Sequence, residues 1–192
     1  MAEKKDVSRI VVAITGASGS IYGIRLLEEL RKAGIETHLI LSDWAKQTIQ
    51  IETMYSVADV AALAVQTYEL NNMGALVASG SFLHRGMIVA PCSMKTLAAI
   101  ANGLENNLII RAAGVTMKEG RKLLLLPRET PLTAIQLENM LKLSRLGVTI
   151  MPPVPALYNK PKDLEAVYCH TVARMLDHFQ IENQMTTRWN GG

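Results

Sequence analysis

The stretch RIVVAITGASGSIYGIRLLEELRK, residues 9–32, decides the fold of this chain. Residues 9–14 hold a continuous run of mostly β-branched residues, which is typical of a strand buried on both faces of a parallel sheet. Glycines follow at 16 and 19, and apolar residues then recur at helical spacing from Ile21 to Leu30. The stretch therefore predicts a strand, a tight loop and a helix, in that order.

The same alternation continues along the rest of the chain. Further strands are expected at 36–41, 86–90, 122–126 and 148–151, and helices at 44–53, 59–65, 93–101, 107–118, 132–146 and 164–179. Pro91 and Pro127 are expected to end two of the strands, because proline has no N–H group for sheet pairing. Five strands alternating with helices predict an α/β fold with a doubly wound, mainly parallel sheet, a Rossmann- or flavodoxin-like three-layer sandwich.

The length and composition narrow the class of protein. We expect the 192 residues to form a single domain over 1–192, with flexible ends at 1–8 and 190–192. The apolar fraction of 49% and the charged fraction of 19% exclude a disordered chain. No apolar run reaches the ~18–20 residues of a membrane helix, and the first residues lack the apolar segment of a secretion signal. Two widely separated cysteines suit a reducing compartment, so we expect a soluble cytoplasmic protein.

The charge pattern points to small anions. The net charge is only +3, and no basic run is longer than two residues. Nucleic-acid binding favours basic clusters interleaved with aromatic residues, so we expect no nucleic-acid partner. Several basic residues instead stand beside loops of small residues or proline, namely Lys95, Arg111, Lys118, Arg128 and Arg174. Solvated surface charge is the alternative explanation for these five.

The loops that follow the strands should carry the chemistry, because ligands of doubly wound sheets bind outside the carboxyl ends of the strands. They are residues 15–19, 42–43, 91–96, 127–131 and 152–158. Glycine lets the backbone approach a ligand, and free N–H groups at the start of the next helix favour an anion. We therefore expect phosphate binding at 15–19, with a merely structural turn as the alternative. Cys92 lies in one of these loops without a neighbouring base, so we expect it to pack rather than react.

A nicotinamide enzyme and a metal enzyme are weaker alternatives. The loop at 15–19 is close to the T-G-x-x-G start of short-chain dehydrogenases, which also need a Tyr-x-x-x-Lys pair on one helix. Tyr158 and Lys162 have that spacing, but the prolines at 155 and 161 argue against a helix there. The four histidines show no metal-binding spacing and there is no aspartate-rich cluster, so we expect no metal site.

Several motifs in the same order resemble the UbiX-type flavin prenyltransferases, including the UbiX-like subunits associated with phenolic acid decarboxylation. They are TGASG at 15–19, PCSMKTL at 91–97, NNLIIRAA at 106–113, MKEGRKL at 117–123, LPRETPL at 126–132 and LENMLKLS at 137–144. The resemblance runs from Ile10 to about Trp189, nearly the whole chain. One such motif alone would carry little weight, but six in order are highly specific.

The resemblance implies a set of site residues. Those expected to contact FMN are Gly16, Ala17, Ser18, Ser42, Ser93, Met94, Lys95, Thr96 and Arg128. Those expected to bind dimethylallyl monophosphate are Tyr158 and Arg174, with Arg111 and Lys118 as further basic residues that often come across a subunit interface. Glu129 matches the family's acid–base glutamate, Ser79 and Glu52 match other catalytic positions, and Trp189 is expected to shield a carbocation.

The implied reaction joins the dimethylallyl group to N5 and C6 of reduced FMN and gives prenylated FMN, the cofactor of a UbiD-type decarboxylase. Arg111, Lys118 and Arg174 would stabilise the leaving phosphate by preorganised charge in place of a metal. The resemblance also implies a homo-oligomer, a dodecamer. Two alternatives stay open: a flavin-dependent decarboxylase that acts directly on an aromatic or peptidyl carboxylate, and a non-catalytic flavin carrier. Neither has an evident need for so many basic residues beyond those for the flavin's own phosphate.

Overall fold

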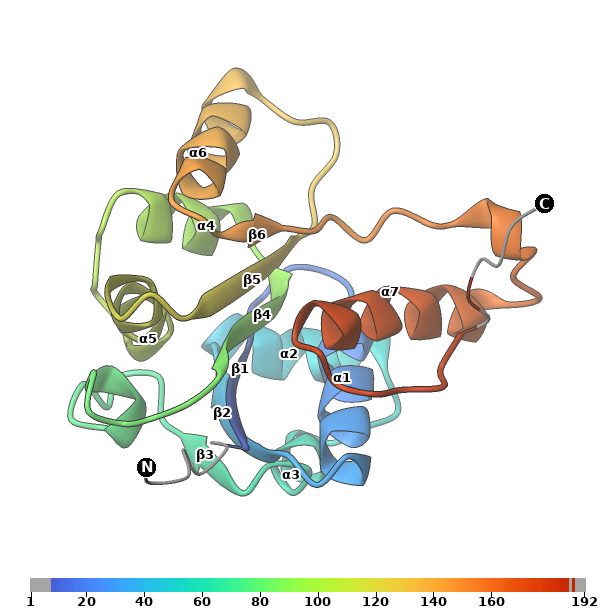
Figure 1. Ribbon diagram of the computed structural model, residues 1–192, viewed down its shortest axis with the longest axis horizontal. Coiled ribbons are helices and arrows are strands. Elements are labelled where there is room, and N and C mark those ends of the chain that lie inside the picture. Colours follow the sequence, from blue (N-terminus) through green and yellow to red (C-terminus); the bar gives the residue numbers. More distant parts are fainter. Residues whose placement is uncertain (1–7, 187, 189–192) are drawn as a thin grey trace, which may run out of the picture.

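The computed structural model describes residues 8–186 and 188 (Figure 1). The ends expected to be flexible, apart from Ser8, lie outside the described residues. Within the described chain a parallel sheet of six strands has the order β3-β2-β1-β4-β5-β6. The strands are β1 Arg9–Ile14, β2 Glu36–Leu41, β3 Gln66–Tyr68, β4 Gly86–Cys92, β5 Lys122–Pro127 and β6 Thr149–Ile150. The doubly wound α/β fold is therefore confirmed.

The sheet differs from expectation at one edge and at Pro91. The strand β3 has only three residues, and its partly exposed side chains offered no apolar run to recognise. Pro91 does not end its strand: β4 continues to Cys92, which pairs with Pro127 after a register shift that begins at Val89. That irregularity lets the strand pass a residue that has no N–H group.

Helices cover both faces of the sheet (Figure 1). The helices are α1 Ser20–Lys32, α2 Asp43–Glu52, α3 Val57–Ala61, α4 Met94–Ala101, α5 Leu108–Lys118, α6 Ala134–Arg145 and α7 Leu164–His178, with short 3₁₀ turns η1 Leu76–Ala78 and η2 Leu157–Asn159. The helix expected at 59–65 begins earlier because Ser56 and Asp59 form a capping box. A second capping box, between Thr133 and Gln136, sets the start of α6.

Two hydrophobic cores lie on the two faces of the sheet. Because neighbouring side chains of a strand point to opposite faces, Ile10, Val12 and Ile14 pack with α1 and α7. Val11 and Ala13 pack on the other face, with α4 and α5. Burial on both faces explains why β1 reads as an uninterrupted apolar run.

The proline-rich segment 151–163 leaves the sheet after β6 and extends away from it to η2 (Figure 1). The chain then returns along α7, which packs on α1. Lys160, the residue after η2, has a left-handed conformation with φ of +48°. No helix therefore joins Tyr158 to Lys162, so these two residues do not form the Tyr-x-x-x-Lys pair of the short-chain dehydrogenases. Among the described residues, no helix has the length and apolar character that crossing a bilayer requires.

Candidate active site

The ends of β1 and β4 are joined through Thr15, where the strand order of the sheet reverses. The buried Thr15 hydroxyl donates to the Pro91 carbonyl at 2.8 Å and accepts the Ser93 N–H at 2.7 Å. The Thr15 N–H also donates to Pro91 O, at 3.2 Å. The loops at 15–19 and 93–96 are thus fixed to each other at the position where doubly wound folds bind ligands.

A cavity of about 480 Å³ opens beside this junction, and α2, α4 and α5 all begin at its rim. Their N-caps line it: Ser42 accepts the Ala45 N–H, Ser93 accepts the Thr96 N–H, and Asn107 accepts the Ile110 N–H. Helix N-termini carry partial positive charge and point N–H groups outward, so they attract an anion.

The remaining walls of this cavity suit a phosphate-bearing aromatic ligand. Lys95 and Thr96 add a cation and a hydroxyl, and Ile109 adds an apolar surface. At Gly16 an added Cβ would lie 2.3 Å from the Cβ of Trp44, so only glycine lets α2 begin this close to the loop. The volume lies within the range of small-molecule and cofactor sites.

Most of the expected FMN contacts therefore surround one cavity. Gly16, Ser42, Ser93, Lys95 and Thr96 line it. Ala17 is buried and the Met94 side chain packs against the core, so a contact from these two would come from the backbone. Sequence reasoning missed Asn107 as a lining residue, although its place before an apolar helix marked it as an N-cap.

The start of α1 holds a carboxylate instead of an open anion site. The Glu52 side chain accepts the Gly19 N–H at 2.8 Å, the Ser20 N–H at 3.1 Å and the Ser20 hydroxyl at 3.0 Å. The expectation that these N–H groups are free for a phosphate was wrong. Burial works to raise the pKa of Glu52, but hydrogen bonds from Gly19, Ser18 and Ser20 outweigh it and hold the pKa below its ordinary value. Glu52 is therefore an anion at neutral pH.

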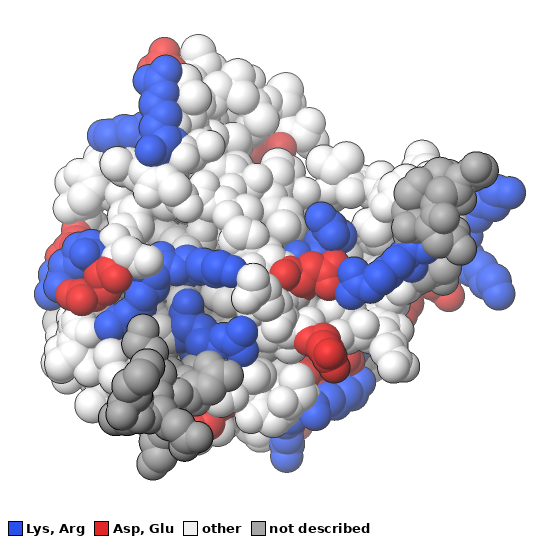
Figure 2. All heavy atoms as spheres, viewed as in Figure 1, with Lys and Arg blue, Asp and Glu red and all other residues white. Residues whose placement is uncertain are grey.

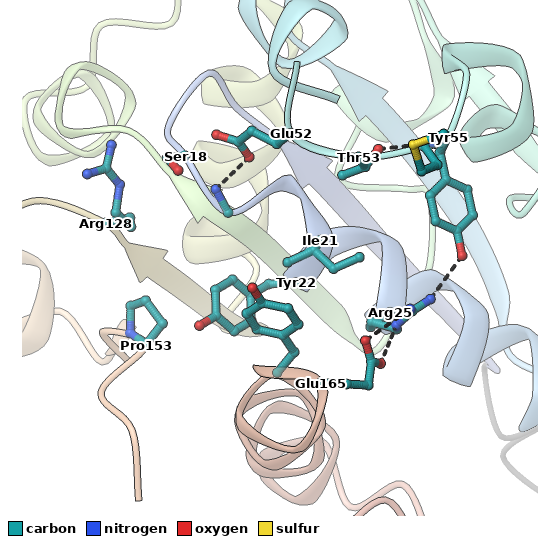
Figure 3. A pocket seen from close by; sticks show the side chains of 13 residues that line it. Ser18, Ile21, Tyr22, Arg25, Glu52, Thr53, Tyr55, Arg128, Pro153 and Glu165 are labelled. Atoms are coloured by element: carbon teal, nitrogen blue, oxygen red, sulfur yellow. Dashed lines mark hydrogen bonds and ion pairs between the residues drawn. The ribbon is translucent and has the colours of Figure 1, made fainter. Parts of the chain in front are cut away.

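Glu52 also lines a second cavity, of about 740 Å³, on the α1 and α7 side of the loop (Figure 3). Figure 3 shows Ser18, Glu52 and Arg128 at one end and Arg25 and Glu165 at the other. The backbone of Arg128 is held in place because its backbone N–H donates to Cys92 O at 3.3 Å. Three expected site residues thus meet at this end of the cavity.

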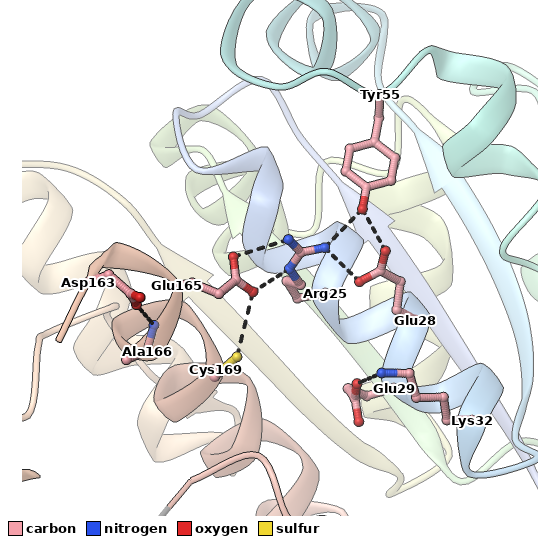
Figure 4. Close-up of polar contacts among 9 residues, drawn as sticks. All are labelled: Arg25, Glu28, Glu29, Lys32, Tyr55, Asp163, Glu165, Ala166 and Cys169. Atoms are coloured by element: carbon pink, nitrogen blue, oxygen red, sulfur yellow. Dashed lines mark hydrogen bonds and ion pairs between the residues drawn. The ribbon is translucent and has the colours of Figure 1, made fainter. Parts of the chain in front are cut away.

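The other end of the second cavity is closed by a network around Arg25 (Figure 4). The Arg25 guanidinium donates to Glu165 at 2.6 and 3.1 Å, to Glu28 at 2.8 Å and to the Tyr55 hydroxyl at 2.9 Å. Tyr55 donates in turn to Glu28 at 2.7 Å. The network joins α1 to α7 and to the segment that follows Glu52.

Three further expected residues lie near η1, on α5 or in the turn that follows η1. Arg111 donates from Nε to Ala78 O at 3.2 Å and pairs with Glu105 at 2.6 Å. Ser79 shares a hydrogen bond with Ser81, at 2.8 Å between their hydroxyl oxygens. Lys118 pairs with Glu119. An added Cβ on Gly80, the residue after Ser79, would lie 2.9 Å from Lys118 Nζ, so Ser79, Arg111 and Lys118 form one group.

Tyr158 and Arg174 form another group, around His170 of α7. The exposed Tyr158 ring meets the His170 ring edge to face, with centroids 6.1 Å apart. Arg174 lies one helical turn beyond His170 and pairs with Asp177 at 3.2 Å. After burial, the charge of Arg174 is the next cause that lowers the pKa of His170.

Lys118 lies far from the first cavity of its own chain. The helix α5 begins beside that cavity and ends at Lys118, and its eleven residues span about 16 Å. This distance is compatible with the expectation that Lys118 serves a site across a subunit interface.

The remaining expected residues are placed as follows. Glu129 is exposed in the loop after β5 and accepts the Thr130 N–H at 3.0 Å; within the described residues it forms no ion pair with Arg128 or Arg121. Trp189 lies outside the described residues. Cys92 is fully buried in the core and burial raises the pKa of its thiol, so it packs as expected. No group of three or more His, Cys, Asp or Glu is placed to hold a metal within the described ranges.

Comparison with known proteins decides the family. The flavoprotein family model matches residues 1–181. The flavin prenyltransferase LpdB of Lactiplantibacillus plantarum is 52% identical over 186 residues, which cover 96% of this chain and all of that protein. The chain is a member of the UbiX-like flavin prenyltransferases.

Two crystal structures of UbiX-like proteins agree closely with the fold. AnUbiX (PadA1), in complex with FMN and dimethylallyl pyrophosphate, has a TM-score of 0.95 and 51% identity over 96% of this chain and 98% of its own. A dodecameric FMN-dependent UbiX-like decarboxylase from Escherichia coli O157:H7 has a TM-score of 0.94 and 52% identity over 95% of this chain and all of its own.

Proposed function

We propose that this protein is a metal-independent flavin prenyltransferase. It transfers the dimethylallyl group of dimethylallyl monophosphate to N5 and C6 of reduced FMN, and its product serves a UbiD-type decarboxylase. The observation that supports this proposal best is that the chain is about half identical to flavin prenyltransferases. It also has more phosphate-binding groups than the phosphate of one FMN requires. We also propose a cytoplasmic location, because Cys92 and Cys169 are both free thiols.

The first cavity is the proposed FMN site. The N-termini of α2, α4 and α5, together with Lys95, supply the positive potential that the FMN phosphate requires. Reduced FMN bound there supplies the nucleophilic nitrogen of the reaction. Because Ser93 is held by Thr15 at the strand junction, the site is rigid before the flavin arrives.

Glu52, Ser18 and Arg128 form the boundary between the two cavities in this proposal. Glu52 stays ionised because three hydrogen bonds from the start of α1 favour its charged form. A fixed negative charge stabilises a positive charge that develops on an allylic group nearby. Glu129, exposed on the next loop, is the proposed proton acceptor for ring closure.

The donor phosphate is bound by groups from neighbouring subunits. Lys118 lies a helix length from the first cavity of its own chain, and Tyr158 and Arg174 line neither cavity. Their positions support a site that is complete only where subunits meet. Arg111, Lys118 and Arg174 then stabilise the leaving phosphate, a task for which prenyl diphosphate enzymes use a metal.

The surface of the chain supports such an assembly. Helix α6 exposes Ile135, Leu137 and Leu141, and Leu146 follows it. Figure 2 shows a broad area with little charge between α6 and the extended segment after β6, while charged side chains of both signs gather around α5. An exposed apolar surface of this kind marks a protein interface. By its likeness to the dodecameric E. coli protein, we propose a dodecamer of this chain.

A direct decarboxylase is the second candidate, since the E. coli relative is described as an FMN-dependent decarboxylase. Decarboxylation on a bound flavin gives no role to two separate groups of donor-phosphate residues. The first candidate therefore accounts for more of the chain.

The test is anaerobic incubation of the protein with reduced FMN and dimethylallyl monophosphate, followed by mass spectrometry of the released flavin. We expect a flavin heavier by one five-carbon unit, formed without added metal and in the presence of a chelator. A parallel reaction with the diphosphate defines the preferred donor. Unmodified FMN from protein that binds both substrates would refute the proposal.

The variant Glu129→Gln separates chemistry from binding. We expect it to form product at least about tenfold more slowly, because a positioned acid or base contributes roughly 10²–10⁴. FMN affinity, measured by quenching of flavin fluorescence, should stay within about twofold, since Glu129 does not line the first cavity. A matching loss of FMN binding would contradict the role assigned to Glu129.

A further inference from the structure

The segment from Ala78 to Phe82, which contains Ser79, has little regular structure of its own. The turn η1 ends at Ala78, and β4 begins only at Gly86. Ser79 bonds to Ser81 through the two hydroxyl groups, and the Ser81 N–H donates to the Ser79 hydroxyl at 3.3 Å. These local bonds shape the turn but do not attach it to the rest of the protein.

The attachment comes from Arg121, in the turn between α5 and β5. Its Nη2 donates to Gly80 O at 2.7 Å and its Nη1 donates to Phe82 O at 2.8 Å. The planar guanidinium with two parallel donors fixes both the position and the orientation of the segment. Lysine at this position would reach only one of the two carbonyl groups at a time.

The same segment lies against the Lys118 ion pair. An added Cβ on Gly80 would lie 2.3 Å from Glu119 Oε1 and 2.9 Å from Lys118 Nζ. Gly80 therefore lets the Lys118–Glu119 pair approach the backbone of the turn. Holding Gly80 O consequently sets where Ser79 lies relative to Lys118.

Beyond the turn, Phe82 docks on the rest of the molecule. Its ring meets His38 edge to face with centroids 4.7 Å apart, and the Arg9 guanidinium lies 5.6 Å from the ring centroid. Arg121 therefore holds the segment between a docked aromatic ring at one end and Arg111, which bonds Ala78 O, at the other. The Arg121 bond to Gly80 O holds the residue after Ser79, the one that lies against Lys118.

We propose that Arg121 is a positioning residue for donor binding: by clamping Gly80 O and Phe82 O it holds the turn that carries Ser79 against Lys118, and so sets the position in which Lys118 binds the donor phosphate. The inference rests on the proposed function, because Lys118 is a donor-binding group only there. Arg121 itself does not touch the donor. Its two carbonyl bonds occupy the fork of the guanidinium.

The test measures the binding of dimethylallyl monophosphate to the protein loaded with oxidised FMN, by titration calorimetry, so that no turnover is required. We expect Arg121→Gln to raise the donor Kd about tenfold, because a misplaced phosphate site loses its charge-assisted bonds. The FMN Kd should stay within about twofold, because Arg121 does not line the FMN cavity. Arg121→Lys keeps the charge and one carbonyl bond, so we expect a donor Kd between those of wild type and Arg121→Gln.

Arg85→Gln is the matched control. Arg85 is also half-buried and also clamps a carbonyl, donating from Nη2 to Phe179 O at 2.8 Å, but its partner lies outside the Ser79 segment. We expect its donor Kd to match that of wild type. A second check is Ser79→Ala: in that background Arg121→Gln should cost less than it does alone, because the two changes act on one element.

Equal donor affinity in wild type and Arg121→Gln would overturn the inference, and so would equal weakening by Arg85→Gln. If Arg121→Gln does not fold, the same criteria apply to Arg121→Lys. Wild-type protein that binds the donor but forms no prenylated flavin would refute the proposed function alone. The affinity comparison would still decide the role of Arg121.

Discussion

Glu52 both accepts the N–H groups at the start of α1 and lines the second cavity. Its carboxylate lies at the start of α1, where an anion is favourable, and it accepts hydrogen bonds from residues 33 and 32 positions earlier. The loop motif predicted a bound phosphate near this helix start, where the structure has the Glu52 carboxylate. It could not show that the anion is a side chain of the protein, because that depends on where α2 ends.

His84 is a buried titratable residue that couples the Ser79 segment to the sheet. Its Nδ1 donates to Gly86 O at 3.0 Å, and its ring stacks with Phe82. Burial lowers the pKa of His84 to about 4, and the charges of Arg121 and His38 act in the same direction.

The shift of His84 predicts acid sensitivity. Because the pKa in the folded protein lies below that of the unfolded chain, the unfolded state binds more protons between about pH 6.5 and 4, and stability falls as pH drops through that range. At pH 5 this group alone should lower the free energy of unfolding by about 2 kcal/mol relative to pH 7.

Urea unfolding at both pH values measures this loss. His84→Asn keeps a donor near the position of Nδ1 but does not titrate, so it should lose correspondingly less stability between pH 7 and pH 5. An equal loss in both proteins would show that other groups cause the acid sensitivity.

At the scale of elements, helix starts form the cavity that we propose binds FMN. Two of the caps, Ser42 and Ser93, could be recognised because each directly follows a buried strand. Asn107 follows a loop instead, and only the packing of α5 beside α4 brings it to the same cavity. Sequence spacing therefore predicts each cap separately but not that the three helix starts meet.

The hydroxyl of Thr15 joins β1 to the end of β4 and the start of α4, and the effect of removing it should be measurable. Thr15→Val keeps the shape of the side chain but leaves the Ser93 N–H without its acceptor, so we expect the free energy of unfolding to fall by about 1–3 kcal/mol. FMN affinity should fall as well, because Ser93 begins α4 at the cavity rim.

Thr116→Val is the matched control for Thr15. The buried Thr116 hydroxyl only donates to Ala112 O, a carbonyl within its own helix, so its removal leaves no N–H group unpaired. Denaturant unfolding and flavin fluorescence titration should show a much smaller effect. Equal losses in the two variants would contradict the special role of the strand junction.

The strands show where local pattern reading succeeds and fails. The run of β-branched residues in β1 predicted its bounds, because burial on both faces selects such residues throughout. The same reasoning missed β3, where only β2 supplies a partner and three residues show no period. It also ended β4 too early at Pro91, because the register shift that accommodates proline depends on the neighbouring strand.

At the scale of the whole molecule, the separation of the basic groups predicts complementation between defective subunits. In the proposed function, Lys118→Ala and Arg174→Ala each remove a group that binds the donor phosphate, so each variant alone should have little activity. If the two residues reach one site from different chains, an equal mixture assembled together should regain up to about a quarter of wild-type activity, because that share of sites draws both residues from intact copies.

Co-expression with two affinity tags isolates the mixed assembly, and product formation per flavin is then measured. The control is an assembly that mixes the double variant with inactive Arg174→Ala, in which no subunit keeps Arg174 and no activity should return. Mixed assemblies of the two single variants without activity would show that Lys118 and Arg174 come from the same chain.

The sequence by itself determined the doubly wound sheet, and it predicted five of the residues that line the proposed FMN cavity. Both follow from local properties: burial selects apolar strands, and strand ends in a parallel sheet meet at one edge. Only the tertiary structure decided that Glu52 fills the start of α1, that Asn107 joins the cavity and that Arg121 holds the Ser79 segment. These contacts join residues from separate elements, so helix length and packing determine them, and the length of α5 separates Lys118 from the first cavity of its own chain.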